Sequence, residues 1–171
     1  MNSVKHFVMM GVAGCGKSSV SAMLAERVNA TVIEADDLHG TENIEKMARG
    51  EALDDDDRWP WLLRVAEKMR ASTTPVITSC SALRRVYRQY LLDNVGSPIG
   101  FIHLHTDRDV IAERMSNRTG HFMPLSLLDS QFQLLEPLQS DERGVTVDIS
   151  QPLDKVVDDA MLYVSAKGAS R

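Results

Sequence analysis

The feature that most constrains this chain is a segment near its N-terminus, residues 11–18, which matches the pattern G-x-x-x-x-G-K-[ST]. Residues 4–10 before it form an apolar run that reads as a buried strand, and residues 18–29 after it carry apolar side chains at helical spacing. A strand, a glycine-rich loop and a helix in this order are the context in which the pattern binds phosphate. The segment therefore predicts a site for a nucleoside triphosphate.

Each kind of residue in this loop has a chemical task. Glycines let the backbone bend tightly, so that its N–H groups and the positive end of the following helix point at phosphate oxygens. Lys17 supplies a mobile positive charge for the β- and γ-phosphates, and the Ser18 hydroxyl is the predicted Mg²⁺ ligand. The predicted nucleotide-binding residues of the loop are Gly11, Gly14, Cys15, Gly16, Lys17, Ser18 and Ser19.

Composition limits the cellular setting and the partners. The 171 residues, 43% of them hydrophobic, are enough for one domain spanning residues 1–171 with a sizeable core. A net charge of −5 argues against a nucleic-acid or anionic-membrane surface, and the chain has neither a membrane-length apolar run nor a signal-peptide layout. We expect a cytoplasmic protein that binds neither nucleic acid nor membranes, in which Cys15 and Cys80 are free thiols.

Apolar patterns predict alternating strands and helices. The predicted strands are residues 4–10, 30–35, 75–80, 99–105 and 145–149, and the predicted helices are 18–29, 43–49, 58–72, 82–93, 107–117, 125–136 and 152–166. This alternation predicts an α/β fold with a parallel sheet covered by helices on both faces. Because such sheets bind ligands at the carboxyl ends of their strands, the residues that follow each strand are the candidates for function.

Carboxylates and a histidine follow the second predicted strand. Glu34, Asp36 and Asp37 come there with His39. A carboxylate at this place can accept a proton from a substrate hydroxyl or hold Mg²⁺ through water. The alternative is a solvated turn with a helix cap, above all for Asp37.

Arginines gather at three later places. Arg58 follows four aspartates, of which Asp57 is the predicted helix cap, and three arginines at 84, 85 and 88 open the next helix. Cations are unfavourable at a helix N-terminus unless an anion lies nearby, so this cluster indicates a ligand, with surface salt bridges as the alternative. Arg114 and Arg118 precede a glycine and resemble the lid of small phosphotransferases, here about residues 118–136.

Several segments together resemble the bacterial gluconate kinases, or gluconokinases, which are P-loop small-molecule kinases. The resemblance runs from about residue 7 to about residue 160, and the phosphate loop alone would not distinguish this family. The other matching segments are Asp36-x-Leu38-His39, Asn43-Ile44-Glu45-Lys46-Met47, Asp55-Asp56-Asp57-Arg58-x-Pro60-Trp61-Leu62, Cys80-Ser81-Ala82-Leu83, Tyr87-Arg88, Gly120-His121-Phe122 and Leu135-Glu136-Pro137. Together, the segments at residues 43–47, 55–62, 80–83 and 120–122 are far more specific than the phosphate loop.

The resemblance implies a fold, a reaction and residue roles. It implies a nucleoside-monophosphate-kinase-like sandwich with strand order 2-3-1-4-5, and transfer of the ATP γ-phosphoryl group to the 6-hydroxyl of D-gluconate with Mg²⁺ in a homodimer. The implied catalytic residues are Lys17, Asp36 and Arg118. The implied substrate-binding residues are Asp36, His39, Arg58, Arg84 and His121, although His121 is equally explained by packing in the lid. The implied adenine contacts are Arg114 and Pro152.

Three positions depart from the family pattern, and other functions remain open. Glu34 stands where some relatives carry Asp, and Gly40 where many relatives carry Pro. Arg84 stands where relatives often carry Lys, which changes the geometry of the charge. Shikimate, another sugar acid or a nucleoside monophosphate would be rival acceptors. A non-catalytic nucleotide-binding regulator would be expected to lack the lid arginine or the post-strand carboxylate, and a GTP switch would need an N-K-x-D motif that the chain does not contain.

Overall fold

The computed structural model describes residues 3–117 and 124–168. Its described strands form a five-stranded sheet in the order β2-β3-β1-β4-β5, and every neighbouring pair of strands is parallel. The strands are β1 (His6–Met10), β2 (Thr31–Glu34), β3 (Val76–Ser79), β4 (Ile99–His105) and β5 (Gly144–Asp148). The predicted α/β class and the predicted strand order are both confirmed.

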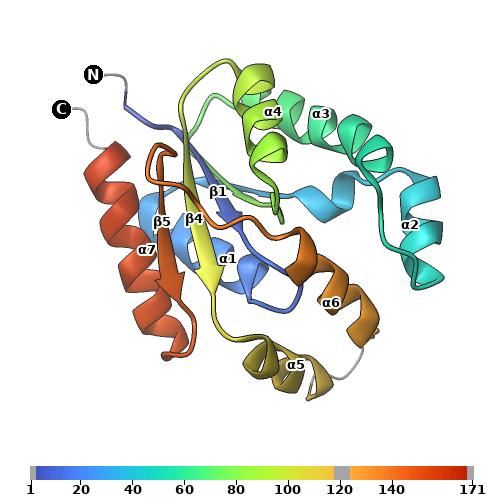
Figure 1. Ribbon diagram of the computed structural model, residues 1–171. Coiled ribbons are helices and arrows are strands. Elements are labelled where there is room, and N and C mark those ends of the chain that lie inside the picture. Colours follow the sequence, from blue (N-terminus) through green and yellow to red (C-terminus); the bar gives the residue numbers. More distant parts are fainter. Residues whose placement is uncertain (1–2, 118–123, 169–171) are drawn as a thin grey trace.

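Helices cover both faces of this sheet (Figure 1). On one face α1 packs against α7, and on the other α3 packs against α4. Two further helices, α5 and α6, lie at the end of the sheet to which the strand arrows point (Figure 1). The helices are α1 (Lys17–Val28), η1 (Ala35–Leu38), α2 (Thr41–Ala48), α3 (Asp55–Ala71), α4 (Arg85–Val95), α5 (Arg108–Ser116), α6 (Leu125–Leu134) and α7 (Leu153–Gly168).

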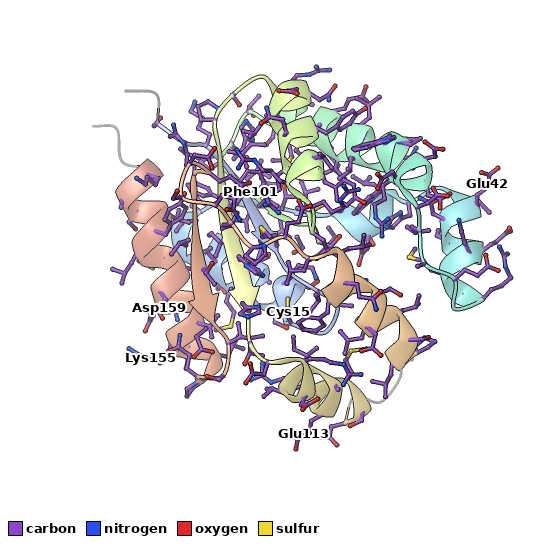
Figure 2. The ribbon with its side chains drawn as sticks, viewed as in Figure 1. Cys15, Glu42, Phe101, Glu113, Lys155 and Asp159 are labelled. Carbon is purple, nitrogen blue, oxygen red and sulfur yellow. The ribbon has the colours of Figure 1, made fainter. Side chains whose placement is uncertain are left out.

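The central strand β1 contributes to two apolar layers. Phe7 and Met9 pack in the layer under α1 and α7, whereas Val8 and Met10 pack in the layer under α3 and α4. The alternation follows from the two-residue period of a strand, and all of β1 is buried because helices cover both faces. Phe101 lies within this interior in Figure 2, whereas labelled charged side chains lie at the periphery. Because both layers pack against β1, the position at which the phosphate loop begins is fixed by the core.

Three helix starts differ from the prediction by two residues or more, and one of them is α2, which begins at Thr41 rather than residue 43. We predicted a helix from residue 58 with Asp57 as its cap, but α3 begins at Asp55 and its N-cap is Asp54. Asp54 and Asp57 form a capping box, in which each carboxylate accepts the other residue's backbone N–H at 2.8 Å. The start of α4 is Arg85 rather than residue 82, because Ala82 has a left-handed φ of 43° that a helix cannot contain.

Both cysteines are free thiols, as predicted, and burial raises the pKa of the Cys80 thiol to about 12. None of the helices in the described ranges is both long enough and apolar enough to cross a bilayer.

A buried histidine on β4 makes stability depend on pH. His103 is 2% exposed, and neither of its ring nitrogens has a hydrogen-bond partner among the described residues. Burial lowers the pKa of His103 to about 4, and the charges of His105 and Arg88 act in the same direction. The folded protein therefore holds this imidazole neutral, whereas the unfolded chain protonates it below the ordinary pKa of 6.5.

We expect the free energy of unfolding to fall as the pH drops below 6.5, because only the unfolded state takes up the His103 proton in that range. His103→Leu removes this contribution. Between pH 7 and pH 5, the wild type should lose about 2 kcal/mol more than the variant, measured by urea unfolding at both pH values. An equal loss in the two proteins would show that another group carries the dependence.

Candidate active site

The phosphate loop joins the end of β1 to the start of α1, as the sequence motif predicts. Gly11 has a φ of 146°, and a Cβ at this position would lie 2.7 Å from the backbone oxygen of Leu104. Gly14 has a φ of 77°, and a Cβ there would lie 2.6 Å from the Met115 side chain. These glycines are therefore required both by the backbone conformation and by the close approach of β4 and α5.

Lys17 turns back over its own loop. Its ammonium group donates to the backbone oxygens of Gly11 and Val12, each at 3.0 Å. These carbonyls are neutral partners, and the lysine side chain is flexible. The ammonium group can therefore move to a more negative group that enters the loop.

The predicted Mg²⁺ ligand contacts a carboxylate from β2. The Ser18 hydroxyl donates to Glu34 Oε2 at 3.0 Å, and the Ser79 hydroxyl donates to Glu34 Oε1 at 3.3 Å. A hydroxyl beside a carboxylate offers the oxygen donors that Mg²⁺ prefers, and Mg²⁺ usually completes its shell with waters and substrate phosphates. The residues present therefore fit this ion, and Glu34 belongs to the candidate site.

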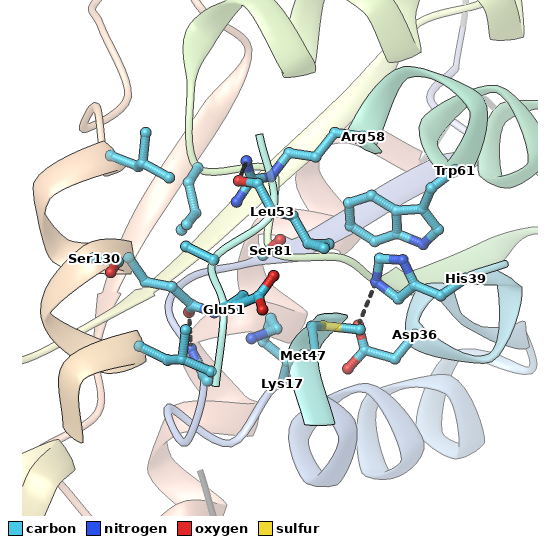
Figure 3. Close-up of a pocket in the computed structure, with 16 residues that line it drawn as sticks. Lys17, Asp36, His39, Met47, Glu51, Leu53, Arg58, Trp61, Ser81 and Ser130 are labelled. Atoms are coloured by element: carbon cyan, nitrogen blue, oxygen red, sulfur yellow. Dashed lines mark hydrogen bonds and ion pairs between the residues drawn. The ribbon is translucent and has the colours of Figure 1, made fainter. Parts of the chain in front are cut away.

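A cavity of about 220 Å³ opens beside the loop (Figure 3). It brings together four of the predicted residues: Lys17, Asp36, His39 and Arg58. Its walls come from the phosphate loop, η1, α2, α3 and α6, together with the segments after α2 and β3. The other lining residues are Ala13, Met47, Glu51, Ala52, Leu53, Trp61, Ser81, Leu83, Leu127, Ser130, Gln131 and Leu134.

His39 is held at the side of this cavity by Trp61. The two rings stack with centroids 4.2 Å apart, and His39 Nε2 lies 3.8 Å from Asp36 Oδ1 (Figure 3). Burial lowers the pKa of His39, partly offset by the nearby charge of Asp36, so the neutral imidazole is favoured. The Trp61 indole N–H donates to the backbone oxygen of Ala35 at 2.6 Å, which ties η1 to α3. Asp36 and His39 are thereby oriented as a pair.

Arg58 and Arg84, which we expected to act together, have different surroundings. Arg58 is 8% exposed, lines the cavity, donates to the Leu53 carbonyl and lies over the Tyr87 ring at 5.4 Å from its centroid. Arg84 does not line the cavity, and its guanidinium donates to Asp55 at 2.9 Å. A hydrogen bond from Tyr87, with Arg84 adding to it, lowers the pKa of Asp55. Arg58 is therefore the better placed of the two to meet an anion in the cavity.

The other arginines of α4 pair with carboxylates of the chain. Arg85 donates to Asp141 on the surface, and the fully buried Arg88 donates to Glu142 at 2.6 Å and 2.9 Å. Both cations are therefore paired within the protein. Arg85 fits the surface salt-bridge alternative, whereas the pair formed by Arg88 is buried.

A second cavity of about 460 Å³ is lined by other residues of the phosphate loop. The Arg114 side chain lines it and donates to the Ile149 carbonyl at 2.6 Å. Pro152 is not among the lining residues, although both of its neighbours in the chain are. Its lining residues are Gly14, Cys15, Gly16, Ser19, Val20, Arg114, Asn117, Ile149, Gln151, Leu153 and Val156. Arg118 and His121 lie outside the described residues.

Comparison with known proteins identifies relatives of this chain. The profile of a family described as an AAA domain matches residues 7–138. The thermoresistant gluconokinase of Escherichia coli K12 is 44% identical over 166 residues, which cover 92% of this chain and 94% of that protein. The chain belongs to the gluconokinase family. It is therefore a kinase with a nucleotide-binding P-loop.

Solved structures of gluconokinase and of a sugar kinase share the fold. The crystal structure of a gluconokinase from Sinorhizobium meliloti 1021 is 45% identical with a TM-score of 0.89, and the match covers 97% of this chain and 94% of that chain. An unliganded sugar kinase from Janibacter sp. HTCC2649 is 41% identical with a TM-score of 0.90, covering 98% of this chain and 99% of that chain.

Sequence reasoning missed several residues of this gluconokinase-family site. Trp61 and Ser81 were part of the family segments but received no role, and Glu51 received none. Gln131 and the other α6 residues at the cavity were treated only as a lid helix. Their spacing, at positions 127, 130, 131 and 134, is that of one helix face and is the signal that could have found them.

Proposed function

We propose that this protein transfers the γ-phosphoryl group of ATP to the 6-hydroxyl of D-gluconate, giving 6-phospho-D-gluconate, with Mg²⁺ as cofactor. The enzyme class, gluconokinase, follows from the family to which the chain belongs. One observation carries the residue-level proposal: residues of the phosphate loop line both a small cavity that contains an arginine and a carboxylate and a second cavity. A sugar acid in the first cavity and a nucleotide in the second would place acceptor and donor on either side of that loop.

In the acceptor cavity, Arg58 binds the gluconate carboxylate, because a guanidinium can hold a planar anion with two hydrogen bonds. Asp36 accepts the proton of the attacking hydroxyl or orients it, and the neutral His39 beside it holds the sugar acid. Arg84 does not touch the substrate. It acts indirectly, through its hydrogen bond to Asp55, which also accepts a hydrogen bond from Tyr87. Transfer depends mainly on positioning and on neutralising charge, so Asp36 contributes less than Lys17.

In the donor cavity, the loop N–H groups and Lys17 hold the phosphates, and Arg114 lies against the adenine with Pro152 near it. Ser18 holds Mg²⁺, with Glu34 beside it. Bound Mg²⁺ neutralises the phosphate charge that develops during transfer. Arg118 closes over the phosphates from a lid of about residues 118–136, and His121 belongs to the same lid.

Further features complete the proposal. The chain acts as one kinase domain of residues 1–171, assembles as a homodimer and works in the cytoplasm on a small-molecule substrate rather than on nucleic acid. A net charge of −5 supports the exclusion of nucleic acid.

A coupled assay of ADP release with ATP and Mg²⁺ tests the acceptor, with D-gluconate, shikimate, L-idonate and AMP as the four candidates. Turnover with D-gluconate alone is expected. Product analysis by ³¹P NMR then tests the position of the new phosphate ester. Turnover with shikimate or AMP instead would retain the phosphate chemistry and reject the proposed acceptor site.

Arg58→Lys tests where the carboxylate binds. Lysine keeps the charge and loses the two-pronged geometry, so we expect the KM for gluconate to rise about 10-fold to 100-fold while the KM for ATP stays unchanged. Arg85→Lys is the matched control, because Arg85 pairs with Asp141 away from the cavity. Equal effects of the two substitutions on the KM for gluconate would contradict the role of Arg58.

A further inference from the structure

A glutamine of α6 reaches across to the phosphate loop. The side-chain oxygen of Gln131 accepts the backbone N–H of Ala13 at 2.6 Å, and Figure 3 draws this contact as a dashed line. Loop N–H groups in this motif are the donors that meet phosphate oxygens. One of them is thus engaged by a neutral side chain from a segment 118 residues away in the sequence.

Ala13 belongs to the loop whose residues line both cavities. Ala13 and Lys17 line the acceptor cavity, whereas Gly14, Gly16 and other loop residues line the donor cavity. With nucleotide and acceptor placed as proposed, a phosphoryl group that passes from one cavity to the other travels along this loop. Gln131 lines the acceptor cavity at the same place.

The hydrogen bond also fixes which way the amide faces. Because the Ala13 N–H is a donor, the oxygen of Gln131 must face the loop, and the NH₂ group, with its two donors, must face away from it. No described residue accepts from that NH₂ group, and Gln131 is half-buried in the cavity wall. Two donors are therefore available to oxygen atoms that enter the cavity lined by Gln131.

The helix that carries Gln131 is tied to its neighbours near its middle and just beyond its C-terminal end. Arg108 of α5 pairs with Asp129 at 2.5 Å, and just beyond α6 the Glu136 N–H donates to the Leu83 carbonyl at 2.8 Å. Leu128 is fully buried under the helix. A donor whose side-chain oxygen is already held by the Ala13 N–H needs little reorganisation when charge develops in front of it.

We infer that Gln131 is a further catalytic residue: its oxygen is held by Ala13, and its NH₂ group donates to the transferring phosphoryl group. This inference rests on the proposed placement of nucleotide and acceptor in the two cavities. In the transfer, negative charge spreads over the equatorial oxygens of that group. Gln131 stabilises this charge from the acceptor side, while Lys17 does so from the loop.

Three variants test the inference. Gln131→Met keeps the size and removes both polar groups, and Gln131→Glu keeps an acceptor for Ala13 but removes the NH₂ donor and adds negative charge. Gln133→Met is the control, because Gln133 is exposed on the same helix. We expect kcat to fall about 10-fold to 100-fold in Gln131→Met and at least as far in Gln131→Glu, with the KM for the acceptor nearly unchanged. Gln133→Met should behave as the wild type.

Two results would overturn the inference. If Gln131→Glu keeps the wild-type kcat, the residue only ties α6 to the loop, because the glutamate preserves that contact. If Gln131→Met binds ATP more tightly at unchanged kcat, Gln131 competes with phosphate instead of assisting its transfer. The variants are compared with whichever acceptor the wild type phosphorylates, so rejection of D-gluconate as acceptor is separable from rejection of Gln131.

Discussion

Replacement of Lys17 by methionine should lower kcat for phosphoryl transfer about a thousandfold or more. Methionine matches the length of the side chain and cannot neutralise the β- and γ-phosphates. In the structure the ammonium group rests on two loop carbonyls, Gly11 and Val12, that it can leave when a triphosphate enters. The loop glycines are untouched by this change, so the fold of the phosphate loop should persist.

The measurement is steady-state kinetics with saturating ATP and acceptor, together with ATP binding by calorimetry. Lys68→Met is the matched control, because Lys68 is exposed on α3 far along the helix from the cavity lining. The control should keep the wild-type kcat. A Lys17→Met enzyme with kcat within tenfold of the wild type would contradict the assigned role of the lysine.

The second large effect concerns stability. Removing Arg88 alone, as Arg88→Met, should lower the free energy of unfolding by about 3–5 kcal/mol. The side chains of Arg88 and Glu142 are 1% and 10% exposed, and Arg88 also donates to the backbone oxygens of Ala82 and Leu83. Without the guanidinium, a carboxylate and two carbonyls lose their donor in the interior.

A nearby exposed pair serves as the control. Arg85 lies on the same helix as Arg88, and Asp141 lies on the same loop as Glu142. The side chains of Arg85 and Asp141 are, however, 47% and 63% exposed. Arg85→Met should therefore cost only about 0–1 kcal/mol in the same urea titration. The double variant Arg88→Met/Glu142→Leu should regain most of the loss, since it leaves no buried charge unpaired. Equal losses at Arg85 and Arg88 would contradict the argument from burial.

The buried pair of Arg88 and Glu142 also makes the free energy of unfolding depend on pH at acidic pH. Burial alone would raise the pKa of Glu142, but hydrogen bonds from Arg88 and from the Gln139 N–H bring it below its ordinary value of 4.5. Its stabilising contribution is thus complete above pH 4.5 and is lost as the pH falls through the lower folded pKa. This range lies below the one in which His103 begins to act, so the two contributions are separable.

Much of the fold follows from local patterns. The phosphate loop, the five strands and most helix positions agree with the sequence prediction, because each depends on spacing within a short stretch of chain. The start of α3 was wrong because Asp54 and Asp57 are equally good caps by type, and only the reciprocal hydrogen bonds select Asp54. The order of the strands came from the family resemblance and not from local pattern.

The site was predictable only in part. Asp36, His39 and Arg58 were found because they follow strands or form family segments, and the structure brings them to one cavity with Lys17. Arg84 looked equivalent to Arg58 in sequence, yet its guanidinium is engaged by Asp55. That difference depends on how α3 and α4 pack, which no spacing along the chain expresses.

The phosphate loop and the α/β class could be predicted because they depend on residue types at short, regular separations, and the family could be predicted because matching segments recur along the chain. Three contacts could be found only in the folded protein: the place of Arg58 in the cavity beside the phosphate loop, the carboxylates that pair with Arg85 and Arg88, and the hydrogen bond between Gln131 and the Ala13 N–H. The physical reason is that each of these contacts joins residues far apart in the chain. Their distances are set by helix packing on the sheet rather than by the residues themselves.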